Sequence, residues 1–272
     1  MKKKITILTV LVVLIFHNYI IGQECGIPQS LKKEIENVIN NNNFSEKDFH
    51  TINQILFKYD YDSLSLLMKC SLYNENIVQL FNSDKSAKRV VAYRLIGVAR
   101  DTRFNDELIK RIRSDESDFL KTWSSTALME NRCSAASDDL FKLFSSYPTS
   151  IPIDILINIY VKYDPVAVKK TCWKFIDSKE RNEQILSIQC LANFESNKKL
   201  QKRLFEFLET WDIKSKGWVI SSMSMQKMGH LKPVLEKYST NEDLKRIIIA
   251  VLKNSPTKED NEFAMKLDEG GN

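Results

Sequence analysis

Apolar residues recur along most of this chain at offsets of three and four positions, the spacing that places side chains on one face of an α-helix. The clearest stretch covers residues 89–97, where Ala92, Leu95 and Ile96 share a face. Short polar segments such as residues 82–85 separate the apolar stretches. The pattern predicts a chain of amphipathic helices joined by short links.

The stretch at 89–97 belongs to a repeat. Related stretches cover residues 121–129, 184–192, 216–224 and 245–253, with a degenerate copy at 153–160 around Leu156. The first inner position of each copy lies at 92, 124, 156, 187, 219 and 248, so the steps are 32, 32, 31, 32 and 29 residues. Other amphipathic stretches lie between the copies, at 106–112, 138–144, 166–176, 200–208 and 231–238. The sequence therefore predicts six two-helix units, whose first and second helices we call A and B.

The ends of the array are predicted from weaker patterns. Residues 45–73 fit one more degenerate unit, with helices near 49–57 and 64–70, and residues 23–44 fit an N-terminal capping segment. The repeats end near residue 265, and residues 266–272 are expected to form a disordered tail. Terminal repeats need polar outer faces, which the asparagines at 40–43 and the polar residues at 257–262 would supply.

Composition favours the same architecture. Seven glycines and six prolines in 272 residues leave few of the tight turns that a sheet protein needs. Pro165, Pro233 and Pro256 lie at or near the starts of predicted A helices, where a missing amide donor costs little.

The B-helix pattern resembles the HEAT repeat family of armadillo-type α-solenoids. That family's B helix typically reads Val-Arg-x-x-Ala-x-x-Ala-Leu-Gly, often after an Asp; residues 88–97, with Asp84 upstream, match it best. The resemblance covers about residues 74–265, although Ser, Val and Ile often replace Ala, and Gln184 replaces the basic residue. It implies an all-α, right-handed α-α superhelix of about six to seven two-helix repeats, and binding rather than catalysis.

The first 22 residues have the pattern of a secretory signal peptide. Three lysines at 2–4 precede a mostly apolar run at 5–16, and Gly22 stands at the expected cleavage point. An uncleaved membrane anchor is the alternative, although the run is short for a span. Both place the rest of the chain outside the cytoplasm, periplasmic or secreted.

Charge excludes some partners. Without the three lysines of the predicted signal peptide, 37 basic residues stand against 35 acidic ones, a net charge of +2. A nearly neutral chain gives no electrostatic reason to expect nucleic-acid binding, and no polybasic block suggests attraction to anionic lipid.

Catalytic and metal-binding patterns are missing from the sequence. His17 lies in the predicted signal peptide, and His50 and His230 are far apart, which argues against a zinc site or a histidine general base. No Gly-rich phosphate loop and no Gly-x-Ser-x-Gly turn occur. We therefore expect no enzyme activity, cofactor or metal.

Five cysteines lack the Cys-x-x-Cys spacing of a zinc ribbon or redox motif. Two disulfides are conceivable outside the cytoplasm. One joins Cys172 to Cys190, on the A and B helices of one unit, and the other joins Cys25 to Cys70. The alternative for Cys190 is that it simply fills the small inner position of its helix.

Two slots of the repeat hold candidate binding residues. Trp123 and Trp218 both stand one position before the inner position, where they either pack in the core or line a groove. Arg89, Lys121, Lys216 and Lys245 stand three positions before it, and would either bind a ligand or contact an acidic residue of a neighbouring repeat.

The resulting hypothesis is a scaffold that binds an unknown protein or peptide in the cell envelope or outside the cell. The alternatives are an accessory subunit or enzyme of the HEAT-like lyase class, and a purely structural envelope component. The sequence does not identify the partner.

Overall fold

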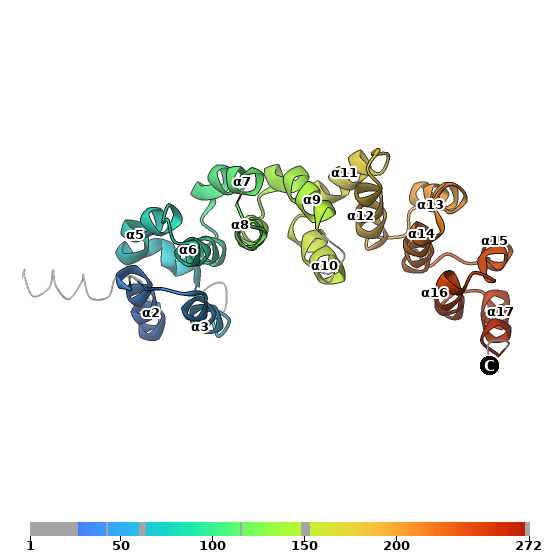
Figure 1. Ribbon diagram of the computed structural model, residues 1–272, viewed down its shortest axis with the longest axis horizontal. Coiled ribbons are helices and arrows are strands. Elements are labelled where there is room, and N and C mark those ends of the chain that lie inside the picture. The colour runs from blue at the N-terminus through green and yellow to red at the C-terminus, as the bar shows by residue number, and fades with distance from the viewer. Residues whose placement is uncertain (1–26, 42, 60–63, 115, 148–152, 270–272) are drawn as a thin grey trace, which may run out of the picture. The chain divides into compact units, whose positions relative to one another are not determined.

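A computed structural model describes residues 27–41, 43–59, 64–114, 116–147 and 153–269. Every regular element in these segments is a helix, so the all-α prediction is confirmed (Figure 1). None of the described helices is long and apolar enough to cross a membrane. The predicted signal peptide lies outside the described residues. The chain divides into two compact units, one ending at Cys133 and one beginning at Ser134.

The first unit contains the first two clear copies of the repeat. Its helices are α2 (Gln29–Asn40), α3 (Glu46–Leu56), α5 (Ser71–Phe81), α6 (Ser86–Ala99), α7 (Asn105–Arg113) and α8 (Asp118–Glu130), with short 3₁₀ turns at Leu66–Lys69 and Thr102–Phe104. The predicted B helices at 89–97 and 121–129 fall within α6 and α8. Each packs on the A helix before it, α5 or α7, and the two B helices pack against each other.

An N-terminal helical hairpin completes this unit. α2 and α3 pack together, and α3 lies on a face of α6 (Figure 1). The boundary predicted at residue 44 therefore falls between two helices that form one hairpin. α3 starts with a capping box between Ser45 and Asp48, and its apolar side, Phe49, Ile52 and Leu56, is buried. Within the second helix predicted at 64–70, the structure has a 3₁₀ turn at Leu66–Lys69.

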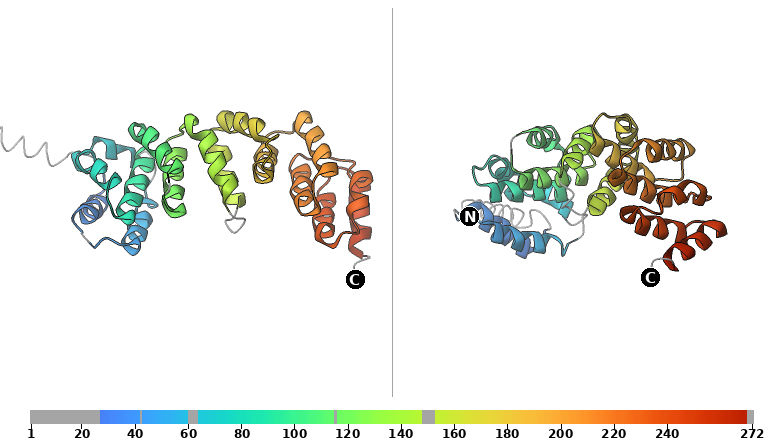
Figure 2. Two further views of the ribbon diagram at one scale, coloured as in Figure 1. Left: turned by 45° about the horizontal axis from the view of Figure 1, so that its top comes forward. Right: turned by 45° about the vertical axis from the view of Figure 1, so that its right-hand side comes forward.

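The second unit holds the remaining copies. Its helices are α9 (Ser137–Ser146), α10 (Ile153–Tyr163), α11 (Pro165–Phe175), α12 (Arg181–Ala192), α13 (Lys198–Thr210), α14 (Ile213–Met225), α15 (Lys232–Leu235), α16 (Glu242–Lys253) and α17 (Lys258–Glu269), with 3₁₀ turns at Ser134–Ala136 and Glu236–Tyr238. The B helices α12, α14 and α16 pack in sequence, and α16 and α17 lie side by side (Figure 2).

Two details of this unit differ from the prediction. The degenerate copy lies in α10, but α12 packs against α9 as well as against α10, so the regular stacking of B helices is interrupted there. Residues 266–269, which the sequence assigns to a disordered tail, form the last turn of α17. Residues 270–272 lie outside the described part of the chain.

Small side chains set the approach of neighbouring B helices, as the sequence predicts. The inner-face residues Ala92, Ser124, Ala127, Ser187 and Ser222 are all buried. A Cβ added to Gly97 of α6 would lie 3.0 Å from the Cα of Ala127 in α8, so only a glycine fits at this crossing.

Three B helices end in the same way, a feature that the sequence analysis missed. Arg100, Arg132 and Lys227 each stand eight positions after the inner position, and each has a left-handed backbone, with φ of 53°, 52° and 51°. The amide of the next residue donates back to Ile96, Leu128 and Met223 respectively, the hydrogen bond of a Schellman cap. The three helices thus share one type of C-terminal cap.

Candidate functional site

The basic slot of the repeat serves the fold rather than a groove. In α6, the Nη1 atom of Arg89 donates to the carbonyl oxygens of Ser83 (2.8 Å) and Asp84 (3.2 Å), just after α5. In α14, the Nζ atom of buried Lys216 donates to the carbonyl oxygen of Leu208 in the last turns of α13, at 2.5 Å. Lys216 thus interacts with the C-terminal end of its own A helix, and Arg89 fixes the link that follows α5.

Of the two roles that the sequence leaves open for this slot, the hydrogen bonds of Arg89 and Lys216 favour the structural one. Lys121 and Lys245, in the same slot, are half-buried. Arg89 also meets an acidic residue of the next repeat, since its Nε atom lies 3.6 Å from a carboxylate oxygen of Glu116. This contact is the structural alternative that the family resemblance implies.

Glu116 is the centre of a polar cluster in the first unit. Besides Arg89, it accepts hydrogen bonds from Arg111 (3.0 Å) and from the hydroxyl of Tyr93 (3.2 Å). Burial, followed by the charge of Glu116, raises the pKa of Tyr93. A phenol held in its neutral form by a structural carboxylate is not an activated acid or base, so the cluster stabilises the fold.

The tryptophan slot gives a different result in each unit. Trp123 of α8 is half-buried and meets the ring of Phe49 from α3 edge-on, with ring centroids 4.9 Å apart. Trp218 of α14 is also half-buried, on a helix that packs mainly against α12, α13 and α16. The two equivalent tryptophans are therefore buried to a similar degree, but among the described residues only Trp123 packs against another ring.

Helical spacing defines the surface to which this slot belongs. α14 packs mainly against its A helix α13 and against α12 and α16, and one side of the helix carries the tryptophan slot. Four positions lie there: five and one before the inner position, and two and six after it. We call these four positions the stripe of a B helix. The stripes are Ala87, Val91, Arg94 and Val98 in α6; Phe119, Trp123, Thr126 and Glu130 in α8; and Lys214, Trp218, Ser221 and Met225 in α14.

Exposure differs between these three stripes. All four positions of the α6 stripe are buried beneath α3 and neighbouring elements. The α8 stripe is partly covered, and Phe119 remains 38% exposed. In the α14 stripe, Lys214 is exposed and Met225 is 40% exposed, while Trp218 and Ser221 are half-buried. The α6 stripe is thus buried, while the α8 and α14 stripes are both partly exposed.

Contacts from α12 and α16 fix the backbone of the α14 stripe. Gln189 of α12 donates to the carbonyl oxygen of Trp218 (3.1 Å) and to the hydroxyl of Ser222 (2.9 Å). On the other side, Gly217 lets Ile247 of α16 approach closely, since an added Cβ would lie 3.0 Å from its Cδ1 atom. Ile247 is half-buried and extends the apolar surface beside Trp218.

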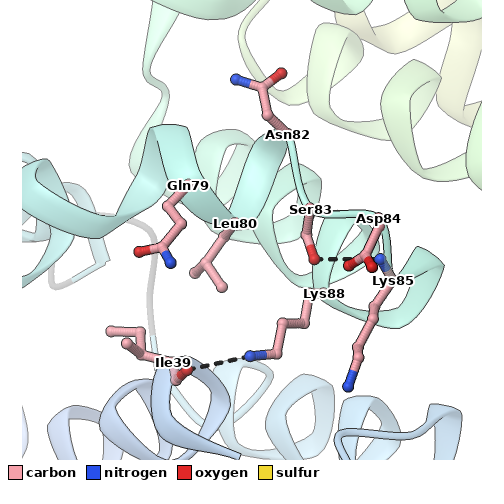
Figure 3. Close-up of a pocket in the computed structure, with 8 residues that line it drawn as sticks. All are labelled: Ile39, Gln79, Leu80, Asn82, Ser83, Asp84, Lys85 and Lys88. Atoms are coloured by element: carbon pink, nitrogen blue, oxygen red, sulfur yellow. Dashed lines mark hydrogen bonds between the residues drawn. The ribbon is translucent and has the colours of Figure 1, made fainter. Parts of the chain in front are cut away.

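Two depressions of the described surface are lined mainly by polar side chains. The one in Figure 3, about 290 Å³, lies between the end of α2 and the link from α5 to α6. Lys88 crosses it to donate to the carbonyl oxygen of Ile39 (3.1 Å), and burial followed by the charge of Lys85 lowers its pKa. A shallow depression of about 640 Å³ over α9 and α11 is lined by a hydrogen-bonded set that includes Asp138, Thr171 and Lys174. No group of metal-binding side chains occurs among the described residues.

One of the two conceivable disulfides is absent from the structure. Cys172 and Cys190 are buried next to each other, but both are free thiols, so the disulfide predicted between them is not formed. Burial and the neighbouring Cys190 thiol raise the pKa of Cys172. Cys70 is disulfide-bonded. Its predicted partner Cys25 lies outside the described residues, and that pairing stays a prediction.

The α14 stripe thus combines an exposed methionine with one predicted site residue, the half-buried Trp218. The sequence missed Lys214, Ser221 and Met225, although their spacing from Trp218 along one helix was a usable signal. Comparisons with protein-family models, with curated proteins and with solved structures found nothing that matches this chain.

Proposed function

We propose that this chain is an exported, non-catalytic helical-repeat scaffold that binds a protein or peptide partner through the α14 stripe. On this proposal the repeats stack as a right-handed α-solenoid, the arrangement that the resemblance to HEAT repeats implies. Export follows from the pattern of the first 22 residues. No cofactor or metal takes part.

The observation that carries the proposal is the contrast between equivalent stripes. Where a neighbouring helix is available in the chain, as at α6, the stripe is buried. At α14, a half-buried indole and a thioether that is 40% exposed lie on a backbone fixed by Gln189 and Gly217. A rigid surface with an aromatic anchor and an adaptable methionine has the composition of a protein-binding hot spot.

Site-specific cross-linking in cells tests this function. A photo-crosslinking amino acid replaces Ser221 in the full chain, and the matched control carries it at Lys202, an exposed position on the A helix α13. We expect one discrete adduct with the Ser221 variant, absent from the Lys202 variant and reduced when Trp218→Ala is added. The absence of any adduct, or identical adducts at both positions, would contradict the proposal.

A further inference from the structure

We propose that the α14 stripe binds an amphipathic helix with an aromatic anchor, an acidic residue one turn before that anchor and an aliphatic residue two turns after it. The inference rests on the proposed function and adds the chemistry of the partner. Its template is the way in which this chain covers the corresponding stripes of its own first unit.

The template is the contact of α3 with α6 and α8. Phe49 lies edge-on to Trp123, at 4.9 Å between ring centroids, and 6.4 Å from the ring of Phe119. One turn later along α3, Asn53 accepts a hydrogen bond from Arg94 of α6 (3.0 Å), whose guanidinium pairs with Glu130. α3 therefore runs in the same direction as α8, with its aromatic anchor at the N-terminal half of the stripe.

Comparison of the two stripes gives the chemistry of the missing helix. The anchor slot is unchanged, because Trp123 and Trp218 are equivalent, and an aromatic side chain edge-on to the indole fits both. The slot before it changes from Phe119 to Lys214, an exposed cation. Here the partner needs a carboxylate, one turn earlier than its anchor.

The fourth position of the stripe also differs between α8 and α14. Glu130, which pairs with Arg94 in the first unit, is replaced by Met225, so a charged or amide side chain on the partner would have no counterpart there. An aliphatic residue two turns after the anchor packs on the flexible thioether instead. Ile247 beside the stripe adds to the apolar floor, and Asp243 occupies the Lys214 slot on α16.

A helix suits this surface better than an extended segment. The stripe is a row of side chains spaced by three and four residues, and such rows accept the matching row of a second helix. An extended peptide would leave its backbone amides unpaired against a helix face, which presents no free backbone groups. Helix-in-groove binding, as α3 already shows within the chain, is therefore the mode that we infer.

The test uses a defined probe and the full chain. The probe is a fluorescein-labelled, hydrocarbon-stapled helical peptide with Glu one turn before Phe and Leu two turns after it, and binding is followed by fluorescence anisotropy. We expect Trp218→Ala to weaken binding by about tenfold or more, as for a central aromatic anchor. Lys214→Glu should weaken it by up to about fivefold, the range of an exposed ion pair.

Matched controls make the result specific. Trp123→Ala, in the same slot but beneath Phe49, should leave binding unchanged, and so should Asp243→Asn. A probe with Phe→Ala should bind at least about tenfold more weakly. No binding of the probe, equal binding of the Phe→Ala probe, or equal loss with Trp123→Ala would overturn the inference. If the probe fails while the Ser221 cross-link still forms, the proposed function stands and the partner chemistry is wrong.

Discussion

Lys216 donates a hydrogen bond from its Nζ atom to the carbonyl oxygen of Leu208, eight residues earlier, and thereby joins the start of a B helix to the end of its A helix. Arg89 makes the equivalent link to Ser83 in the first unit. In these two units, the basic residue of the slot thus binds backbone carbonyls that precede its B helix.

Replacing Lys216 tests that role. Lys216→Ala removes a charge-assisted hydrogen bond and the contact with the ring of Tyr238, 4.6 Å from Nζ to the ring centroid. We expect a loss of about 1–3 kcal/mol in the free energy of unfolding, measured by urea denaturation. Lys245→Ala, in the same slot but only half-buried, should cost less than about 0.5 kcal/mol. Equal losses in the two variants would show that the slot has no special link to its A helix.

Gly97 lies where α6 and α8 cross closely, so a larger side chain has little room there. In Gly97→Ala, the new methyl group would press on the Cα of Ala127 and on the carboxylate of Glu130, which pairs with buried Arg94. Disturbing a buried ion pair is costly, so we expect a loss of about 2–4 kcal/mol, measured as above.

Gly217→Ala is the matched control for this variant. Its Cβ would meet only the end of the Ile247 side chain, at 3.0 Å, which can move. The higher helix propensity of Ala, worth about 1 kcal/mol, should offset that contact. A Gly97→Ala variant as stable as Gly217→Ala would mean that the crossing of α6 and α8 is looser than the structure indicates.

The helices could be predicted from sequence because a period of three to four residues is a local signal. The inner positions near 92, 124, 187, 219 and 248 all lie in helices, and the small residues among them are buried. Local patterns do not say which distant segment covers a helix face, so the docking of α3 on α6 was not foreseen. The roles of Arg89 and Lys216 depend on which way a long side chain turns, and spacing alone does not determine that.

The left-handed caps of the B helices predict a substitution that stabilises the protein. Lys227 has a left-handed backbone, which costs a residue with a Cβ roughly 1 kcal/mol and costs glycine almost nothing. Lys227→Gly should therefore raise the free energy of unfolding by about 0.5–1 kcal/mol. Lys253→Gly, within the last turn of α16 and not left-handed, should lower it by a similar amount. Destabilisation by both changes would contradict the cap.

The free thiols of the second unit predict a pattern of chemical labelling. Burial and the adjacent Cys190 keep the Cys172 thiol protonated at neutral pH, and the thiolate is the reactive form. Iodoacetamide at pH 8 should therefore label neither residue in the native chain and both after unfolding without reductant. Peptide mapping of protein purified from its native compartment should give the same result. Recovery of a Cys172–Cys190 disulfide there would show that the pair oxidises in that compartment.

Acid sensitivity should depend on Asp101. Burial alone would raise the pKa of this carboxyl, but hydrogen bonds from Arg103 and from the hydroxyl of Tyr73 outweigh it and hold the pKa below its usual value. A lowered folded-state pKa contributes stability above the unfolded value, about 3.9, and that stability is lost as the pH falls through the folded pKa. Asp101→Asn should therefore cost about 2–3 kcal/mol at pH 7 and flatten the loss of stability below about pH 4, measured by urea denaturation across pH. Asp106→Asn, at an exposed position of α7, should leave the loss of stability at acid pH unchanged. If stability falls as steeply with pH in Asp101→Asn as in the unchanged chain, other carboxyls cause the acid sensitivity.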